Sequence, residues 1–426
     1  MTDRSLAEWL DLLESRHPSE IELGLHRVNE VWQRLQAAHG LKQHQAPLAI
    51  TVAGTNGKGS CLACMQALLL EQGYSVGLFT SPHFMRYNER ICLNGDPVAD
   101  SSIVSAFEQI EMQCQGISLT YFEFGTLAAL LIFYQTRPDI MLLEVGLGGR
   151  LDAINIIDAD VAVLTSIALD HQEWLGDTRE QIAREKLGIA RRDQPLIIGE
   201  QDHPSGFKQM VAETGAKALY AGIDFAHTEG DPFTAQLIST SGLLQIEALQ
   251  QSSLLAINKT LALQALYAAG LSLDTDLSRD VLNRVVLMGR RQRLNFKGLE
   301  IILDVAHNPA AARALAEYLH NDEGPFLAVA SVLGDKDWSG IVAEMSSVIE
   351  HWYIAEISGS SRASKGQYLL ELLYNSSHSG DLYESIQQAF LEAVNGAKES
   401  HKVVVFGSFH TVALVLDLIL AEVNSE

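Results

Sequence analysis

The residues with the clearest chemical potential lie between Leu48 and Ser60, which read LAITVAGTNGKGS. An apolar run leads into a glycine-rich loop that carries one lysine, Lys58, and closes on the hydroxyl of Ser60. Glycines let backbone N–H groups converge on phosphate oxygens, the lysine adds a point charge, and the helix that follows presents its positive end. The segment therefore predicts a phosphate-binding loop.

The amino-acid sequence of this loop departs from the common motif, G-x-x-x-x-G-K-[ST]. Val52 stands where the first glycine belongs, and Gly59 separates Lys58 from Ser60. Variants of the loop distinguish ATPase lineages from one another, so these departures narrow the class of protein.

Oxygen and nitrogen donors follow the ends of other strand-like runs. Ser81 follows the second run, Glu144 ends a later one, and His171 lies shortly after another. Donors at the ends of adjacent strands beside a phosphate loop suit Mg²⁺, which takes few protein ligands and leaves room for phosphates and water. The structural alternative is that Ser81 caps a turn, Glu144 pairs with Arg150, and His171 is an ordinary loop residue.

Two further segments leave their interpretation open. Lys186 lies in Arg184–Gly188, where its spacing alone indicates a solvated charge on a helix. Asp304 ends an apolar run and is followed by Val-Ala-His-Asn-Pro, which suits either a capped helix start or a ligand-binding turn. Residues 146–149, GLGG, are not a dinucleotide fingerprint, because no third helix-opening glycine or spaced acid follows.

These residues need a scaffold, and the first part of the chain alternates strand-like and helical runs. Strands are expected at Ala49–Ala53, Val76–Thr80, Ile140–Val145, Val161–Ser166 and Pro195–Ile198. Helices are expected at Cys61–Gln72, Ile103–Cys114, Gly125–Gln135, Arg179–Arg191 and Lys259–Ala269. Continuous apolar strands separated by helices predict a parallel sheet covered on both faces. Short alternating runs between Ala216 and Ile257 predict a small antiparallel element.

A second α/β series begins near Leu299, with strands expected at Glu300–Asp304, Phe326–Ala330, Trp352–Ala355 and Lys402–Phe406. The basic stretch Leu287–Lys297 separates the two series. The predicted fold class is α/β, with a P-loop ATPase domain over residues 1–288 that contains the parallel sheet and the small antiparallel element. A joint at 289–297 and a smaller Rossmann-like doubly wound domain at 298–426 follow. Ligands of such sheets bind at the carboxyl ends of the strands.

Composition excludes several classes of function. The chain has 426 residues, is 47% hydrophobic and carries a net charge of −23. This acidity argues against nucleic acid or an anionic membrane as a partner, because both require a basic face. Four cysteines do not form a disulfide framework in a chain of this length, and charges scattered among the first leucines leave no signal-peptide core. The predicted location is the cytoplasm.

Motifs over essentially the whole chain resemble those of bacterial dihydrofolate synthase/folylpolyglutamate synthases, a family of the Mur ligase superfamily. They appear in order as Thr51–Ser60, Ser81–His83, Leu119–Glu123, Leu143–Ala153, Thr165–His171, Arg184–Gly188, Asp304–Pro309 and Val404–Thr411. One such motif carries little information, whereas the full set in register is highly specific.

The resemblance implies an ATP-dependent amide ligase. ATP would phosphorylate the carboxylate of dihydropteroate, or the terminal glutamate carboxylate of a reduced folate, and the amino group of L-glutamate would displace the phosphate. Charge around the transferred phosphoryl group needs neutralisation, which Lys58 and Mg²⁺ can supply. Two Mg²⁺ ions are expected. The family is usually monomeric, so a monomer is expected.

The resemblance also assigns roles to individual residues. It implies that Gly57, Lys58, Gly59 and Ser60 hold the ATP phosphates, that Asn258, Arg290, Asp304 and His307 contact the nucleotide, and that Ser81, Glu144 and His171, helped by Ser60, ligate the metal. Lys186 matches the family lysine that CO₂ carbamylates to N6-carboxylysine, which replaces a cation by a carboxylate near the metals. Lys58, Lys186 and His171 are thus the implied catalytic residues.

The pterin part of the substrate falls on two segments by the same resemblance, Thr120, Tyr121, Phe122 and Glu123, and Leu151, Asp152 and Ala153. Phe122 would stack on the flat ring, and the Asp152 carboxylate would accept its N–H donors. The alternative is that Tyr121 and Phe122 are core residues at a helix start.

The chain departs from the family pattern at a few positions. Asn258 is flanked by Ile257 and Lys259, where the family usually has Pro and Ala, and Ile154 replaces a usual Thr. A second arginine, Arg291, follows Arg290, so either arginine suits the nucleotide contact.

Other functions remain as alternatives. A folylpolyglutamate synthase that lacks dihydrofolate synthase activity, or another Mur-superfamily amino-acid ligase, would keep the ATP loop and lose part of the pterin segment. A non-enzymatic nucleotide-binding switch is a different class. A guanine-specific switch needs Asn-Lys-x-Asp, and the Asn-Lys at 258–259 is followed by Thr-Leu.

Overall fold

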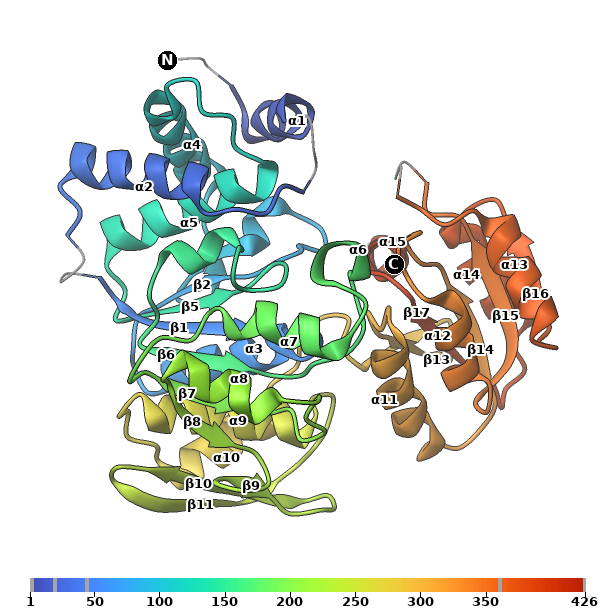
Figure 1. The fold of residues 1–426 in the computed structure, drawn as a ribbon. Coiled ribbons are helices and arrows are strands. Elements are labelled where there is room, and N and C mark those ends of the chain that lie inside the picture. Colours follow the sequence, from blue (N-terminus) through green and yellow to red (C-terminus); the bar gives the residue numbers. More distant parts are fainter. Residues whose placement is uncertain (1–3, 18–20, 43–45, 359–361, 424–426) are drawn as a thin grey trace. The chain divides into compact units, whose positions relative to one another are not determined.

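A computed structural model describes residues 4–17, 21–42, 46–358 and 362–423, and its chain forms two compact units (Figure 1). The first comprises Met1–Ile167 and Leu175–Val285, and the second comprises Ala168–Trp174 and Val286–Glu426. No helix in the described part of the chain is both long and apolar enough to span a membrane.

The first unit is built on an eight-stranded sheet with the order β4-β3-β2-β5-β1-β6-β7-β8. Its strands are β1 (Leu48–Ala53), β2 (Val76–Phe79), β3 (Ile91–Leu93), β4 (Asp96–Pro97), β5 (Ile140–Glu144), β6 (Val161–Leu164), β7 (Pro195–Ile198) and β8 (Lys217–Tyr220). All neighbours pair in parallel except at the β2–β3 and β3–β4 edges. The loop after β1 therefore leaves the sheet between β5 and β6, beside the ends of both strands.

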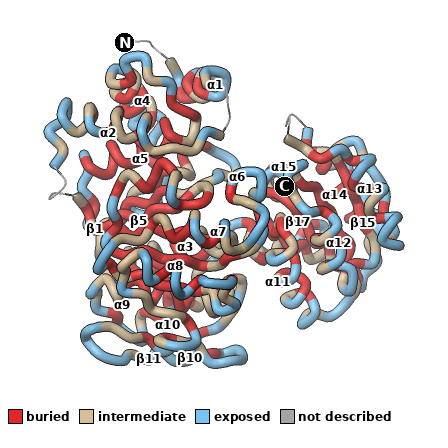
Figure 2. Tube along the Cα trace, viewed as in Figure 1, coloured by how far each residue is buried: buried red, intermediate tan, exposed pale blue. Residues whose placement is uncertain are grey.

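Helices cover this sheet as its apolar strands require. They are α1 (Leu6–Arg16), α2 (His26–His39), α3 (Lys58–Glu71), α4 (Asp100–Cys114), α5 (Tyr121–Thr136), α7 (Arg179–Leu187), α8 (Phe207–Thr214), α9 (Ala256–Ala268) and α10 (Thr275–Arg284), with 3-10 turns η2 (Tyr87–Arg90) and η3 (Ala153–Ile156). Strands β1 and β5 are buried along almost their whole length, as the red segments of Figure 2 show. Helix α5 is buried from Glu123 to Tyr134, because it packs against α1, α2, α4 and β2.

The small antiparallel element is confirmed, with one correction. The strands β9 (Ala226–His227), β10 (Phe233–Ser239) and β11 (Gly242–Leu249) form a separate three-stranded sheet. The stretch Lys217–Tyr220, which was expected to belong to it, instead pairs in parallel with β7 and extends the main sheet. Its short length concealed which sheet it joins.

The second unit holds a six-stranded sheet with the order β12-β13-β17-β14-β15-β16. Its strands are β12 (Gln292–Phe296), β13 (Leu299–Leu303), β14 (Phe326–Ala330), β15 (Ile349–Ala355), β16 (Gly380–Tyr383) and β17 (Lys402–Phe406), and its helices are α11 (Pro309–His320), α12 (Trp338–Met345), α13 (Gly366–Asn375), α14 (Ile386–Gly396) and α15 (Phe409–Val423). Both sheets together confirm the predicted α/β fold class.

The predicted joint at 289–297 is not a linker. Most of it is β12, which pairs antiparallel with β13 as a hairpin at the edge of the second sheet. The change of unit falls at Val285–Val286 instead, directly after α10. The segment Ala168–Trp174, which lies inside the predicted first domain, belongs to the second unit because of side-chain contacts described below.

Candidate active site

The phosphate loop is held by the strand next to it. Backbone N–H groups of Thr55 and Asn56 donate to the carbonyl and hydroxyl of Ser166, at 2.9 Å each. The Thr165 hydroxyl donates to the Asn56 carbonyl at 2.6 Å. These contacts fix the loop at the end of β6.

Two glycines of the loop lie where a side chain has no room. A Cβ on Gly54 would come within 1.8 Å of the Thr165 hydroxyl, and one on Gly57 within 2.5 Å of the Asn258 side-chain oxygen. Gly57 also has φ +90° and is the N-cap of α3. The structure thus brings together Asn258 and Gly57, two residues predicted to contact the nucleotide.

We expect Gly57→Ala to weaken binding of AMPPNP by tenfold or more. The added methyl group must displace the Asn258 amide, and the positive φ adds strain of roughly 1 kcal/mol. Titration calorimetry measures the effect. Gly73→Ala is the matched control, because Gly73 has φ +84° but nothing within 4 Å of its added Cβ. Equal affinities for the two variants would contradict the close contact.

Lys58 and Ser60 open helix α3. The Lys58 ammonium donates to the carbonyl oxygens of Gly54, at 2.9 Å, and Thr55, at 3.3 Å, so the lysine folds over its own loop. Ser60 is buried in the first turn of the helix. Both residues therefore lie where the sequence predicts, at a helix N-terminus that favours anions.

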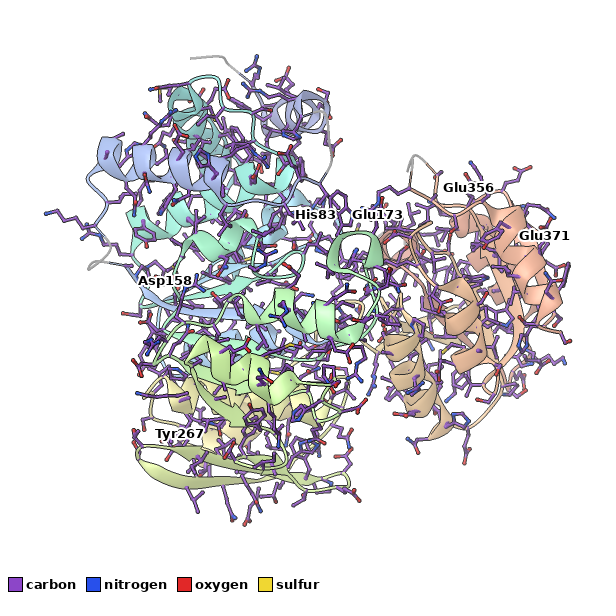
Figure 3. All side chains as sticks on the ribbon, viewed as in Figure 1. His83, Asp158, Glu173, Tyr267, Glu356 and Glu371 are labelled. Atoms are coloured by element: carbon purple, nitrogen blue, oxygen red, sulfur yellow. The ribbon has the colours of Figure 1, made fainter. Side chains whose placement is uncertain are left out.

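Two of the predicted metal ligands, Ser81 and Glu144, are neighbours. The Ser81 backbone N–H donates to the Glu144 carboxylate at 3.3 Å, across the paired strands β2 and β5. Glu144 is buried. Arg150 pairs with Glu185 at 2.8 Å rather than with Glu144, so the ion pair considered in the structural alternative does not form. His83, labelled in Figure 3, lies on the same turn as Ser81 and accepts a hydrogen bond from Arg90 at 2.8 Å.

The third predicted ligand, His171, belongs to the second unit. Its neighbour Asp170 accepts hydrogen bonds from Lys336 at 2.6 Å and from Asn308 at 3.2 Å, and it lies 3.4 Å from His307. These contacts attach the segment 168–174 to the C-terminal unit. No motif marks Lys336, which lies 166 residues along the chain from Asp170.

Burial favours the neutral form of His171. Burial lowers the pKa of His171 to about 4, even though the nearby Asp170 favours its protonated form. Burial alone would raise the pKa of Asp170, but the hydrogen bond and charge of His307, together with His171 and Lys336, hold it well below its usual range. A neutral imidazole is the form that binds metals. Asp170, His171 and Asp335 place their possible ligand atoms within 4.8 Å of one another.

Lys186 is buried in the last turn of α7, so its interpretation as a solvated charge is wrong. The helix packs closely on the turn that follows Glu144, because a Cβ on Gly149 would come within 2.9 Å of the carbonyl oxygens of Glu185 and Lys186. The eight-stranded sheet of the first unit therefore positions the elements that carry three of the predicted site residues. These residues are Lys58, Glu144 and Lys186.

The structure distinguishes the two adjacent arginines. The Arg291 side chain is buried, where it donates to the Ala314 carbonyl at 2.8 Å and lies over the Tyr318 ring at 4.7 Å. The Arg290 guanidinium lies 5.7 Å from the centre of the Phe409 ring. Because Arg291 is fixed inside the unit, Arg290 is the better candidate for a nucleotide contact.

Asp304 and Asn308 shape the turn after β13. The Asp304 carboxylate accepts from the backbone N–H groups of Arg291 at 3.0 Å and Ala306 at 2.8 Å. Asn308 is the N-cap of α11, and His307 contacts the Val305 carbonyl at 2.8 Å. The capped helix start is thus present, and a ligand-binding role for Asp304 and His307 remains a proposal.

The predicted pterin segment begins helix α5 through a capping box. The Glu123 carboxylate accepts from the Thr120 N–H at 2.8 Å, and the Thr120 hydroxyl accepts from the Glu123 N–H at 3.2 Å. Arg27 also donates to Glu123, at 3.0 Å. This reciprocal pattern satisfies orphan donors of the first helical turn. Thr120 and Glu123 therefore fix the start of helix α5. Their contact with the pterin stays a prediction.

The Phe122 ring lies against the turn after Glu144. Its centre is 6.0 Å from that of Phe79, and a Cβ on Gly146 would come within 2.6 Å of the ring. Only glycine at position 146 leaves space for an aromatic side chain here. Tyr121 packs edge-on against Tyr87 at 5.7 Å, and Tyr121 and Phe122 are both half-buried against the core.

Asp152 lies buried between Leu151 and Ala153, and its carboxylate accepts two backbone hydrogen bonds. The donors are the N–H groups of Leu147 at 2.8 Å and Ile154 at 2.9 Å. Burial raises the pKa of Asp152 to about 6, although these hydrogen bonds and the charge of Lys58 oppose the rise. At pH 7 the group is ionised and keeps lone pairs for N–H donors of a ligand.

The pKa of Asp152 predicts how stability changes with pH. The folded state holds its proton up to about pH 6, whereas the unfolded state releases it near the ordinary value of 3.8. The contribution of Asp152 to the free energy of unfolding is therefore greatest below pH 3.8, and it falls as the pH rises to about 6. We expect the free energy of unfolding of the wild type, minus that of Asp152→Asn, to decrease between pH 4.5 and 6.5 in urea titrations. A flat difference would contradict the raised pKa.

The donor set fits a divalent metal and a nucleotide. Gly57 leaves a cradle that a Cβ would fill, Ser60 contributes a hydroxyl, and Glu144 contributes a buried carboxylate. Hydroxyl and carboxylate oxygens with few protein ligands are what Mg²⁺ takes in phosphate sites.

Comparison with known proteins gives the class first. Residues 52–251 match the Mur ligase middle domain, and residues 289–409 match the Mur ligase glutamate ligase domain. The chain is 43% identical to the dihydrofolate synthase/folylpolyglutamate synthase of Escherichia coli over 97% of its own length and 95% of that protein. It is 30% identical to the folylpolyglutamate synthase of Lacticaseibacillus casei, over 87% and 90%.

Solved structures agree. E. coli FolC in complex with DHPP and ADP superposes with a TM-score of 0.91 at 42% identity, over 99% of both chains. A bifunctional folylpolyglutamate synthase/dihydrofolate synthase with Mn, AMPPNP and L-glutamate bound gives 0.89 at 40% identity, over 98% of both chains. The fold and the loop are those of an ATP-dependent, amide-forming Mur ligase. Within that class, the chain belongs to the dihydrofolate synthase/folylpolyglutamate synthase family.

Proposed function

We propose that this chain joins L-glutamate to dihydropteroate, and also to the terminal glutamate of reduced folates, through an acyl phosphate formed at the expense of ATP. One observation carries the proposal. The Phe122 ring packs on Gly146, which lies two residues after Glu144. The turn that contains Gly146 also contacts Asp152 and the helix that carries Lys186. The reacting carboxylate of dihydropteroate is on its aminobenzoate group, so a pterin ring held beside Phe122 would leave that group to extend toward the residues that handle phosphate.

The residues of the first unit divide the work. Gly57, Gly59 and Ser60 donate backbone and side-chain hydrogens to the ATP phosphates, and Lys58 neutralises the charge of the transferred group. Ser81 and Glu144 hold a divalent metal, which supplies further charge neutralisation when bound. Phe122 and Asp152 orient the pterin, and Leu151 and Ala153 line its edge.

Residues of the second unit complete the proposal. Arg290, Asp304 and His307 contact the nucleotide, and His171 is a metal ligand through its neutral imidazole. In the first unit, Asn258 contacts the nucleotide beside Gly57, as the distance between the two residues supports.

Once ATP has phosphorylated the acceptor carboxylate, the amine of L-glutamate attacks the acyl phosphate. An amide bond forms, and phosphate leaves with the electrons of the broken C–O bond.

We further propose that CO₂ carbamylates Lys186. The side chain is buried among elements that also carry Glu144. Its ammonium would first lose a proton, the neutral amine would form a C–N bond to CO₂ and release a second proton to solvent, and the resulting carbamate would be attracted to nearby divalent metals. Two Mg²⁺ ions are expected on this basis. All four cysteines are free thiols, which supports a reducing compartment such as the cytoplasm. A monomer is expected from the family pattern.

The test is whether ADP release depends on both co-substrates. We expect ADP from the purified chain only when dihydropteroate, or a reduced folate, is present together with L-glutamate. ATP turnover that ignores both would identify a nucleotide-binding switch and refute the ligase. Glutamylation of tetrahydrofolate without any of dihydropteroate would establish the narrower alternative, a folylpolyglutamate synthase alone.

A further inference from the structure

Lys259, next to the nucleotide-contact residue Asn258, is a fully buried lysine that the mechanism does not use. Its exposed fraction is 0%, and it is among the largest completely buried side chains of the chain. Burial lowers its pKa. Among the described residues, the charge of Asp231 opposes this fall in pKa, but the hydrogen bonds of the Lys259 ammonium go to uncharged oxygens. A buried cation without a counter-ion is costly, so hydrogen bonds must compensate.

All three ammonium hydrogens of Lys259 find acceptors. They donate to the Gln250 carbonyl at 2.6 Å, the Ser252 hydroxyl at 3.1 Å and the Leu282 carbonyl at 2.7 Å. Gln250 and Ser252 lie in the loop between β11 and α9, and Leu282 lies in the last turn of α10, where the helix dipole attracts a cation. One side chain thereby joins three segments around the start of α9.

The start of α9 has no side-chain cap. The N-cap residue is Leu255, which makes no capping hydrogen bond. The third and fourth residues of this helix are Asn258 and Lys259, so they share its first turn. Asn258 in turn lies against Gly57 of the phosphate loop. A shift of this turn by a few tenths of an ångström would move the Asn258 amide relative to the loop.

We propose that Lys259 is the positioning residue that fixes the first turn of α9, and so holds Asn258 against the phosphate loop for nucleotide binding. The proposal rests on the nucleotide role of Asn258 given above. A proline at 257 would preset φ in the first helical turn, where its missing N–H costs nothing. Here Ile257 lacks that constraint, and Lys259 supplies the order in another way.

The experiment measures AMPPNP affinity by calorimetry together with thermal stability. We expect Lys259→Ala to weaken AMPPNP binding about fivefold to tenfold, the equivalent of one neutral hydrogen bond. Lys259→Met, which keeps the length of the stem, is the second variant if the alanine protein does not fold. Gln264→Met is the matched control, because Gln264 is also buried on α9 and bonds both backbone groups of Ile238, away from Asn258.

Two further variants separate positioning from stability. In an Asn258→Ala background, Lys259→Ala should weaken AMPPNP binding no further, because its effect passes through Asn258. Adding Ile257→Pro to Lys259→Ala should restore most of the affinity. A Lys259 variant that lowers the melting temperature but not the affinity, or effects of the two alanine substitutions that add, would overturn the proposal. Failure of the wild type to bind AMPPNP would instead count against the proposed function.

Discussion

Lys58→Met is expected to lower kcat for ADP formation by roughly a hundredfold to a thousandfold, the range for loss of one preorganised charge at a reacting group. The ammonium already lies over its loop, 2.9 Å from the Gly54 carbonyl, so little rearrangement is needed to reach a phosphate oxygen. Methionine keeps the stem and removes the charge. The KM for L-glutamate should change little, because the lysine acts on the phosphoryl group.

Steady-state assays with saturating dihydropteroate and L-glutamate measure this effect. Lys217→Met is the control, since Lys217 is exposed on β8, away from the loop. A Lys58→Met enzyme with kcat within a few-fold of the wild type would refute the assignment of the loop.

Lys186→Ala is expected to lower kcat by roughly a hundredfold, because it removes the carbamate that we propose forms from CO₂ on this side chain and helps to hold the metal. Short carboxylates such as acetate should restore part of the activity, since they can occupy the space that the side chain leaves. The native protein should also be heavier by one CO₂, an increment that acid removes and that the variant lacks.

Arg184→Ala is the matched control on the same helix, because Arg184 is exposed whereas Lys186 is buried. Full loss of activity without carboxylate rescue, together with an unmodified mass in bicarbonate, would show that Lys186 acts as an ordinary lysine. The proposed roles of Lys58 and the phosphate loop do not depend on that outcome.

Local signals in the sequence were enough for the sheet and the phosphate loop. Apolar runs located β1, β2, β5, β6, β7 and β14 within a residue or two. Helix starts were less accurate. The helix α3 begins at Lys58, three residues before the predicted Cys61, because its N-cap is Gly57 with a positive φ rather than a Ser or Asp. The capping box of Thr120 and Glu123 was visible as T-x-x-E, yet these residues were assigned to the ligand.

Contacts between distant parts of the chain could not be predicted. Asp170 with Lys336, and Thr165 with the loop carbonyls, join residues more than a hundred positions apart. No periodicity or spacing marks such pairs. For the same reason the attachment of segment 168–174 to the second unit, and the burial of Lys186, appear only in the structure.

In the proposed reaction, a carboxylate of the acceptor is phosphorylated before glutamate attacks. Dihydropteroate that carries ¹⁸O in its carboxylate distinguishes this order of events from direct attack. We predict that each turnover with ATP and L-glutamate yields dihydrofolate and inorganic phosphate that contains one of the labelled oxygens, as mass spectrometry of the phosphate will show. Phosphate released without label would contradict an acyl-phosphate ligase.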